Sequence, residues 1–157
     1  MEWTTHALSG VVSGYLVTGG DWKGAIVGGV TGVIPDLDEP KSKFGKVLLP
    51  ISVPLNKIFG HRTFTHSLLF AVLMGAILFP FTERWIWLAS VVGILAHVAG
   101  DMMTGKVYVL YPMKKPIGIP VSRTGFLLID RIVRFGLGVV VLFVLGKEAL
   151  YHLRMLI

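Results

Sequence analysis

The sequence predicts an all-α membrane protein: a polytopic helical bundle of about five helices, with one re-entrant or interfacial segment and a loop that covers one end. Its 157 residues fit a single domain, residues 1–157. Hydrophobic residues make up 54% of the chain and charged residues 15%, and the mean hydropathy is +0.73, which is more apolar than a typical soluble domain. The 19 glycines are typical of helices that pack closely in lipid.

Two apolar segments, residues 6–19 and 22–34, predict a pair of helices joined by a turn at Gly20 and Asp21. Both are short, because a hydrocarbon core about 30 Å thick needs about 20 helical residues. They therefore either cross a thinned bilayer or form a tilted pair. Pro35 ends the second segment, and residues 36–40 follow as a polar corner.

The middle of the chain predicts an interfacial element and two further helices. Residues 41–60 place four lysines around an apolar run that contains Pro50 and Pro54, a pattern typical of an interfacial or re-entrant segment. Residues 65–80 and 85–103 predict the third and fourth helices. Trp85 and Trp87 stand where aromatic anchors at the membrane interface are expected.

The last third predicts a loop, a helix and a tail. Residues 104–130 contain three prolines and several glycines, so we expect a loop that covers the site. Residues 132–145 form the fifth apolar helix. Residues 146–157 are amphipathic and are expected to lie on the opposite membrane surface.

These chain reversals bring metal-ligand residue types to one side of the membrane, although they are scattered over the whole sequence. Eleven of the fifteen lysines and arginines fall on that same side, which predicts by the positive-inside rule that the site is cytoplasmic. The candidate metal ligands are His6, Asp36, His61, His66, His97, Asp101 and Asp130.

The strongest local motif lies on the fourth helix. His97 and Asp101 are four residues apart and Thr104 follows three later, so all three project from one helical face and one metal could take both ligands. The alternative is a polar stripe packed against another helix. An ionised carboxylate within an apolar helix is costly, which favours metal binding.

A second motif precedes the third helix, where His61, Arg62, Thr65, His66 and Ser67 fall within seven residues. Thr65 is placed to cap the helix, with His66 and Ser67 in its first turn. The planar guanidinium of Arg62 suits a phosphate or a carboxylate. The alternative is a capped interfacial helix with incidental histidines.

The remaining candidates carry less information one by one. Asp36 and Asp38 would point the same way in an extended stretch, although a turn with solvated acids explains them equally well. His6 is a ligand or a core histidine. Asp130 is a ligand, a residue that orients a ligand, or the ion-pair partner of Arg131.

The donor set defines the chemistry. The chain has no cysteine, so mixed imidazole and carboxylate ligands remain, and these suit one or two divalent ions: zinc first, with manganese, iron or magnesium as alternatives. Two ions would activate water and stabilise charge on a phosphoryl oxygen. The candidate catalytic residues are Arg62 as anion holder, Asp38 as base, and the hydroxyl groups of Thr65 and Ser67.

Taken together, these motifs resemble the YdjM-like family of membrane-bound, metal-dependent hydrolases, also described as LexA-binding inner-membrane proteins. The resemblance is carried by His6, residues 35–38, residues 60–67, residues 97–101, and Arg123 to Gly125 followed by Asp130. It implies a small polytopic hydrolase with ligands at His6, Asp36, His61, His66, His97 and Asp101. Asp130 stands where the family is expected to carry glutamate. The helix motif is also similar, remotely, to the zinc-dependent phospholipase C and nuclease group.

We therefore expect a hydrolase that cleaves a phosphoester of a lipid or lipid-linked substrate at the cytoplasmic face of the inner membrane. One alternative is a metal-handling or transport protein, which would need polar groups on both surfaces. Another is a membrane scaffold that binds a soluble regulatory partner through its basic face. The net charge of +6 is spread around apolar segments, which favours anionic lipid head groups over direct binding of nucleic acid.

Overall fold

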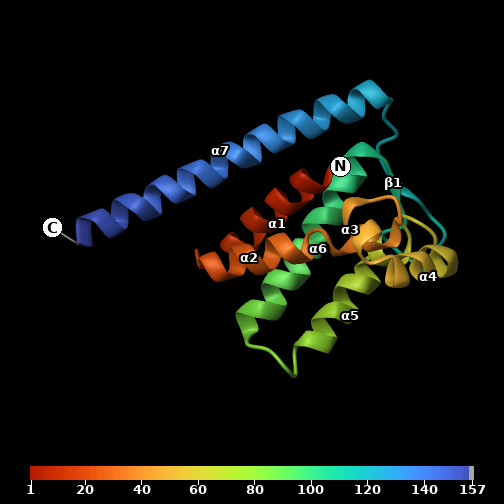
Figure 1. Ribbon diagram of the computed structural model, residues 1–157, viewed down its shortest axis with the longest axis horizontal. Helices are drawn as coiled ribbons and strands as arrows, with labels where there is room; N and C mark the ends of the chain where they lie inside the picture. The colour runs from red at the N-terminus through yellow and green to blue at the C-terminus, as the bar shows by residue number, and fades with distance from the viewer. Residues whose placement is uncertain (156–157) are drawn as a thin grey trace.

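The computed structural model describes residues 1–155, and 73% of the chain is helical, as the sequence predicts. Figure 1 shows a group of short helices at the centre and one long helix that crosses it and extends beyond it. The elements, in chain order, are α1 (Trp3–Val17), α2 (Trp22–Thr31), η1 (Ile34–Asp38), α3 (Lys43–Val47), α4 (Leu49–Phe59), η2 (Phe64–His66), α5 (Leu68–Leu78), α6 (Arg84–Thr104), β1 (Lys106–Val107), β2 (Ile117–Gly118) and α7 (Arg123–Met155).

Glycines bring α1 and α2 into backbone contact. A Cβ atom added at Gly14 would lie 2.1 Å from the carbonyl oxygen of Gly24, and one added at Gly10 would lie 2.2 Å from that of Gly28. The Asp21 carboxylate caps α2 by accepting a hydrogen bond from the Lys23 amide at 2.8 Å. The pair is therefore held close enough for the first turns of α1 to reach the site.

Helix α6 runs through the centre of the protein and contacts α1, α2 and α5 (Figure 1). Ala89, Ile94 and Val98 are buried along it, and a Cβ atom added at Gly93 would lie 2.5 Å from the Gly28 carbonyl oxygen. The antiparallel pair β1 and β2 packs Val107 against Val98. This packing fixes the C-terminal end of α6, where the site lies.

Within residues 1–155, α6 is the one helix that is long and apolar enough to cross a membrane. Its 21 residues span about 31 Å at about 1.5 Å per residue, which matches a hydrocarbon core about 30 Å thick. Helices α1, α2 and α5 have 15, 10 and 11 residues. The predicted helical fold is therefore confirmed, whereas the number of spans stays a prediction.

Two predicted helix starts were wrong. The third predicted helix begins at Leu68, because η2 precedes it and the Ser67 side chain, which accepts a hydrogen bond from the Phe70 amide at 3.1 Å, is the cap in place of Thr65. The last helix begins at Arg123, nine residues before the prediction, where Ser122 accepts hydrogen bonds from the amides of Gly125 and Phe126. It also continues through the predicted separate tail to Met155.

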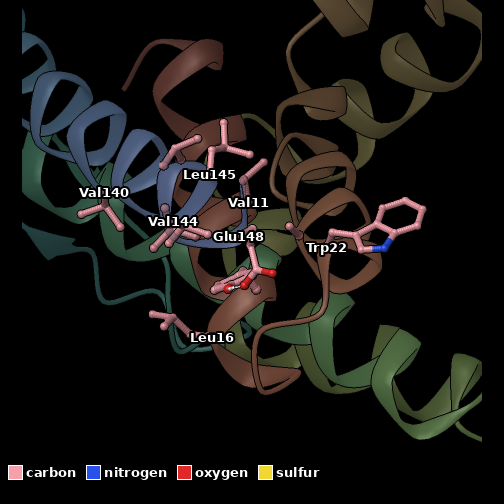
Figure 2. A pocket seen from close by; sticks show the side chains of 11 residues that line it. Val11, Leu16, Trp22, Val140, Val144, Leu145 and Glu148 are labelled. Carbon is pink, nitrogen blue, oxygen red and sulfur yellow. Dashed lines mark hydrogen bonds between the residues drawn. The ribbon is translucent and has the colours of Figure 1, made fainter. Parts of the chain in front are cut away.

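Helix α7 lies against α1 along one face only. Tyr15 of α1 donates a hydrogen bond to the Glu148 carboxylate at 2.9 Å, and Val11, Trp22, Val140 and Val144 are among the largely apolar residues that line a groove around this pair (Figure 2). At its other end Arg134 donates to the Thr4 hydroxyl at 3.1 Å. These two contacts fix the register of α7 on α1.

Candidate metal centre

Two aspartates reach the site from η1, which forms because Pro35 has the backbone angle that the start of a helical turn requires. The expected extended stretch was therefore wrong. Asp36 and Asp38 do not point the same way: Asp36 faces His66 and His97, whereas Asp38 faces His61 and His66. The two carboxylates can therefore have different roles.

Asp38 is fully buried and gathers four donors. His61 Nδ1 donates to Oδ1 at 2.7 Å, the Arg62 amide and the Thr65 hydroxyl reach Oδ2 at 3.1 and 2.5 Å, and His66 Nδ1 lies 3.2 Å from Oδ2. Three of these donors therefore converge on Oδ2, and His61 occupies Oδ1. We assign Asp38 to orienting His61 and His66, because a carboxylate with four donors is poorly placed to act as the predicted base.

The backbone at Arg62 has a φ of 61°, a conformation that a non-glycine residue rarely adopts. It is held there from both sides, since its amide donates to Asp38 and its carbonyl accepts from the Tyr108 amide at 3.0 Å. Such strain costs about 1–3 kcal/mol and tends to occur at functional sites. The loop of residues 105–122 therefore supports the site by fixing Arg62, and it is shorter than the predicted loop of residues 104–130 because α7 begins at Arg123.

Helix α6 contributes His97 and Asp101 from one face, four residues apart as predicted. His97 is buried, and its Nδ1 donates to the Gly32 carbonyl at 2.7 Å, which leaves Nε2 as the free nitrogen. His6 of α1 stacks on the His97 ring with 3.6 Å between centroids. The α1 and α2 pair thus positions both imidazoles.

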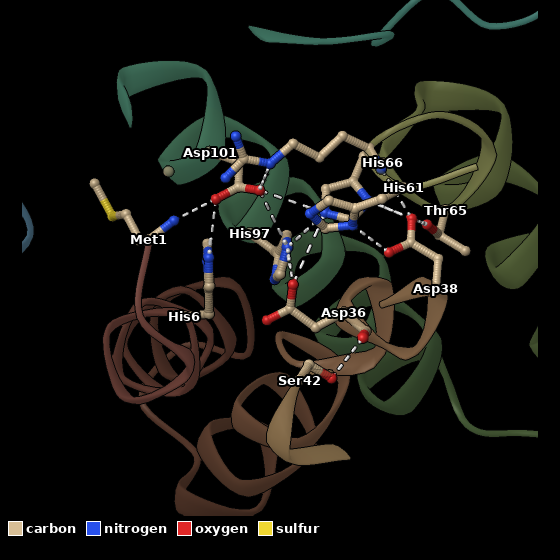
Figure 3. A network of polar contacts seen from close by, with 12 residues as sticks. Met1, His6, Asp36, Asp38, Ser42, His61, Thr65, His66, His97 and Asp101 are labelled. Atoms are coloured by element: carbon tan, nitrogen blue, oxygen red, sulfur yellow. Dashed lines mark hydrogen bonds and ion pairs between the residues drawn. The ribbon is translucent and has the colours of Figure 1, made fainter. Parts of the chain in front are cut away.

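Four ligand atoms converge at the centre of the site, as Figure 3 shows. His66 Nε2 and His97 Nε2 lie 3.1 Å apart. Asp36 Oδ1 lies 4.0 Å from His66 Nε2 and 3.7 Å from His97 Nε2, and Asp101 Oδ2 lies 3.4 and 4.0 Å from the same two nitrogens. Ligands of a tetrahedral zinc ion stand about 3.3 Å apart, given bonds of about 2.0–2.1 Å. Five of the six separations among these atoms are therefore close to that value, and the ligand atoms of Asp36, His66 and His97 all lie within 4.8 Å of one another.

The hydrogen bonds of the two histidines support this fit. His66 Nδ1 faces the oxygens of Thr65 and Asp38, and His97 Nδ1 faces a carbonyl, so each Nδ1 carries a proton. The two Nε2 lone pairs would then point at each other across 3.1 Å between two carboxylates. That arrangement requires a positive species between them, either a proton or a metal ion.

A second grouping lies beside the first. Asp101 Oδ1 is 3.1 Å from His6 Nε2 and also contacts the amino group of Met1, which lies 3.2 Å from the Thr104 hydroxyl. His6 is 1% exposed, and its Nδ1 has no hydrogen-bond partner. The two oxygens of Asp101 therefore face two different donor sets, which is the geometry of a bridging carboxylate.

The opening of the site carries three polar side chains. His61 is exposed beyond its contact with Asp38, Asp36 is partly exposed, and about a quarter of the Arg62 side chain is exposed although its Nε atom is buried. Arg62 Nε lies 3.1 Å from Asp101 Oδ2 but is not aligned for a hydrogen bond with it. Arg62 is thus an ion-pair partner of the centre that also faces outward.

Burial and hydrogen bonding shift the pKa values of Asp36, Asp38 and His66 in different directions. Burial raises the pKa of Asp36 above its usual value. Burial also acts to raise the pKa of Asp38, but hydrogen bonds from His61 and His66 outweigh it and hold that pKa well below its usual range. Burial opposes protonation of His66, yet its contacts with Asp101 and Asp38 raise its pKa to about 9. Without a metal, His66 therefore holds a proton at neutral pH.

Three further predicted site residues, Thr65, Ser67 and Asp130, make contacts away from the four-atom centre. Thr65 is buried and bonded to Asp38, so it supports that carboxylate. Ser67 caps α5 and donates to the Phe64 carbonyl at 2.6 Å, which leaves its hydroxyl no free direction toward the centre. Asp130 accepts a hydrogen bond from the Glu2 amide at 2.8 Å and lies 3.7 Å from Arg134. These contacts pair Asp130 with Arg134 and not with Arg131, and they favour a structural role over the ligand role that the sequence suggested.

Three supporting groups were not found from the sequence. The Gly32 carbonyl orients His97, the Asn56 amide donates to the Asp38 carbonyl at 2.7 Å, and a Cβ atom added at Gly105 would lie 2.3 Å from Arg62 Nη1. A backbone carbonyl has no sequence signature. Gly105 could have been noticed in the sequence, since a glycine directly after the end of a helix can mark a place where another group approaches the backbone closely.

The comparisons with known proteins agree on one family. The family model described as YdjM inner membrane protein matches residues 1–155. Inner membrane protein YdjM of Escherichia coli K12 is 36% identical over 110 residues, which cover 65% of this chain and 56% of that protein. The uncharacterized protein YvsG of Bacillus subtilis is 33% identical over 104 residues, covering 64% of this chain and 65% of that protein.

The chain thus spans little more than half of the E. coli protein that it matches. No solved structure matches it significantly. The name of the E. coli relative agrees with the membrane location that composition predicts, and neither name assigns a reaction. On the match over residues 1–155, the chain belongs to the YdjM inner membrane protein family.

Proposed function

We propose that this protein is a metal-dependent hydrolase that cleaves a phosphoester of a lipid or lipid-linked substrate at the cytoplasmic face of the inner membrane, in a polytopic arrangement. The observation that carries the proposal is the pair of buried imidazole nitrogens, His66 Nε2 and His97 Nε2, that face each other at 3.1 Å between two carboxylates. Two histidines that only supported the fold would not require two carboxylates around their Nε2 atoms.

The primary ion would be held by Asp36, His66, His97 and Asp101. A neighbouring position is offered by His6 and the second oxygen of Asp101. When bound, a zinc-class divalent ion would supply Lewis acidity and lower the pKa of a water molecule. Zinc suits the nitrogen and oxygen donors best, with manganese, iron or magnesium as alternatives.

The residues of the chain itself support phosphoester binding at the opening. The Arg62 side chain is partly exposed, and its planar guanidinium can donate two parallel hydrogen bonds to two oxygens of a phosphate. His61 is exposed at the same opening, and its Nδ1 is bonded to the buried Asp38, which leaves Nε2 as the nitrogen free for a substrate oxygen. We assign it to substrate contact, in place of the ligand role expected from the family resemblance.

The test uses the full chain purified in nanodiscs and loaded with zinc. We expect release of head group or phosphate from at least one member of a phospholipid panel, and we expect the variants His66→Ala and Asp101→Ala to lose metal and activity together. Glu83→Gln is the control, because Glu83 is exposed and bonded only to Trp85. A metal-loaded protein that leaves every lipid intact would contradict the proposal.

A further inference from the structure

Helices α3 and α4 form an outward surface that the metal centre does not use. Helix α4 turns Ser52 and Asn56 inward, whereas Ile51, Pro54 and Ile58 follow one another on its exposed face. The outward side chains are apolar and well exposed: Val47 is 78% exposed and Ile58 71%. A helix with one face buried and the other apolar and exposed is typical of an element that lies in a membrane interface.

The charges on this surface are all of one sign. Lys41, Lys43, Lys46 and Lys57 are exposed around the aliphatic side chains, and residues 40–82 contain no aspartate or glutamate. The nearest acid, Glu39, has its carboxylate bonded to the Lys41 amide at 3.0 Å. Lysine stems can lie along an apolar surface while their ammonium groups reach anionic head groups.

We propose that α3 and α4 form a docking surface for the anionic phospholipid head groups of the bilayer, and that seating on them holds the opening of the metal centre at head-group depth. The docking surface is defined as Lys41, Lys46, Val47, Ile51, Lys57 and Ile58. The lysines account for binding to anionic lipid, and the exposed aliphatic side chains between them favour lipid over an acidic soluble protein.

The surface is connected directly to the ligands. The Ser42 hydroxyl, which caps α3, donates to the Asp36 carbonyl at 2.9 Å, and the Asn56 amide of α4 donates to the Asp38 carbonyl at 2.7 Å. His61 follows the C-terminal end of α4 after Gly60. A bilayer that fixes α3 and α4 therefore also fixes η1 and the opening.

The test places an environment-sensitive fluorophore on the docking surface. Because the chain has no cysteine, Val47→Cys and Ile58→Cys each give a single labelling site. We compare the full chain in nanodiscs of phosphatidylcholine alone and of phosphatidylcholine with an equal amount of phosphatidylglycerol. In the anionic discs we expect a blue-shifted emission and quenching by lipids that are spin-labelled near the head group.

Matched lysine variants separate this surface from net charge. Neutralising Lys41, Lys46 and Lys57 to glutamine should remove more than half of the shift that phosphatidylglycerol produces, whereas neutralising Lys106, Lys114 and Lys115, which removes the same charge from the loop, should leave it. Labels that stay in water in both discs, a signal that ignores phosphatidylglycerol, or an equal loss in both variants would overturn the proposal. The readout needs no turnover, so a failure of hydrolysis does not affect it.

Discussion

The position of the Arg62 guanidinium depends on the absence of a side chain at Gly105. A Cβ atom there would lie 2.3 Å from Arg62 Nη1, which is the movable end of a long side chain, so Gly105→Ala should push the guanidinium away without disturbing the backbone. We expect KM for the phosphoester to rise about tenfold, since hydrogen bonds to charged groups contribute about 1.5–3 kcal/mol. Metal content should stay unchanged. Gly136→Ala, in open space on α7, is the control; loss of metal in Gly105→Ala would refute this interpretation.

His66 makes metal binding depend on pH. Its pKa is raised to about 9 in the metal-free protein, so at neutral pH a metal ion must displace its proton. The apparent affinity should therefore rise by about tenfold per pH unit between pH 6 and 8 and level off above pH 9. Titration of the metal-free protein with cobalt, followed by its visible absorption, measures this. An affinity that is constant over the range would mean that His66 is neutral before the metal binds.

At the residue scale, spacing within one element was predictable and orientation was not. His97 and Asp101 lie on one face of α6 because helical geometry dictates it. The roles of Asp36 and Asp38 depended on whether residues 34–38 were extended or helical. Pro35 favours the helical turn, and contacts with Ser42 and Asn56, which no sequence pattern shows, hold it in place. Ser67 could have been recognised as the cap, since it directly precedes an uninterrupted apolar run.

At the element scale, the α1 and α2 pair supports the centre through its glycines. In Gly14→Ala, the added Cβ would lie 2.1 Å from the Gly24 carbonyl oxygen, which is backbone and cannot move aside. The helices should separate and His6 should shift, at a cost of about 1–3 kcal/mol in unfolding free energy. A lower Tm in detergent together with a lower metal content is the expected result. Gly138→Ala on α7, where nothing lies within 4 Å, should change neither.

The predicted element boundaries were wrong where the apolar pattern and the capping or proline signals disagreed. The apolar pattern that placed the last helix begins near Ile132. The helix instead starts at Arg123, where Ser122 caps it, and it includes Asp130, which faces α1. The number of elements in the middle of the chain was harder to predict, since prolines at 50 and 54 suggested interruptions and α4 instead includes both. Pro50 is in the first turn, where it costs no hydrogen bond.

At the scale of the whole molecule, the centre is assembled from four segments that are distant in sequence: α1, η1, η2 and α6. Their convergence was predictable from chain reversals, because each ligand stood at the end of an apolar segment. What could not be predicted is the role of α7, which supplies no ligand to the centre. Instead it holds the start of α1, and with it His6, through contacts of Asp130 and Arg134.

Substitutions at Asp130 and Asp101 can therefore distinguish a structural carboxylate from a metal ligand. Asp130→Asn keeps an oxygen that can accept from the Glu2 amide and loses only the charge near Arg134, so metal content should be unchanged and unfolding free energy should fall by about 1 kcal/mol. Asp101→Asn removes charge from an atom that faces two imidazoles and should lose most of the bound metal. Elemental analysis of both variants against wild type gives the answer. If Asp130→Asn also loses metal, then α7 contributes to the centre directly, and our assignment of α7 to holding the start of α1 is wrong.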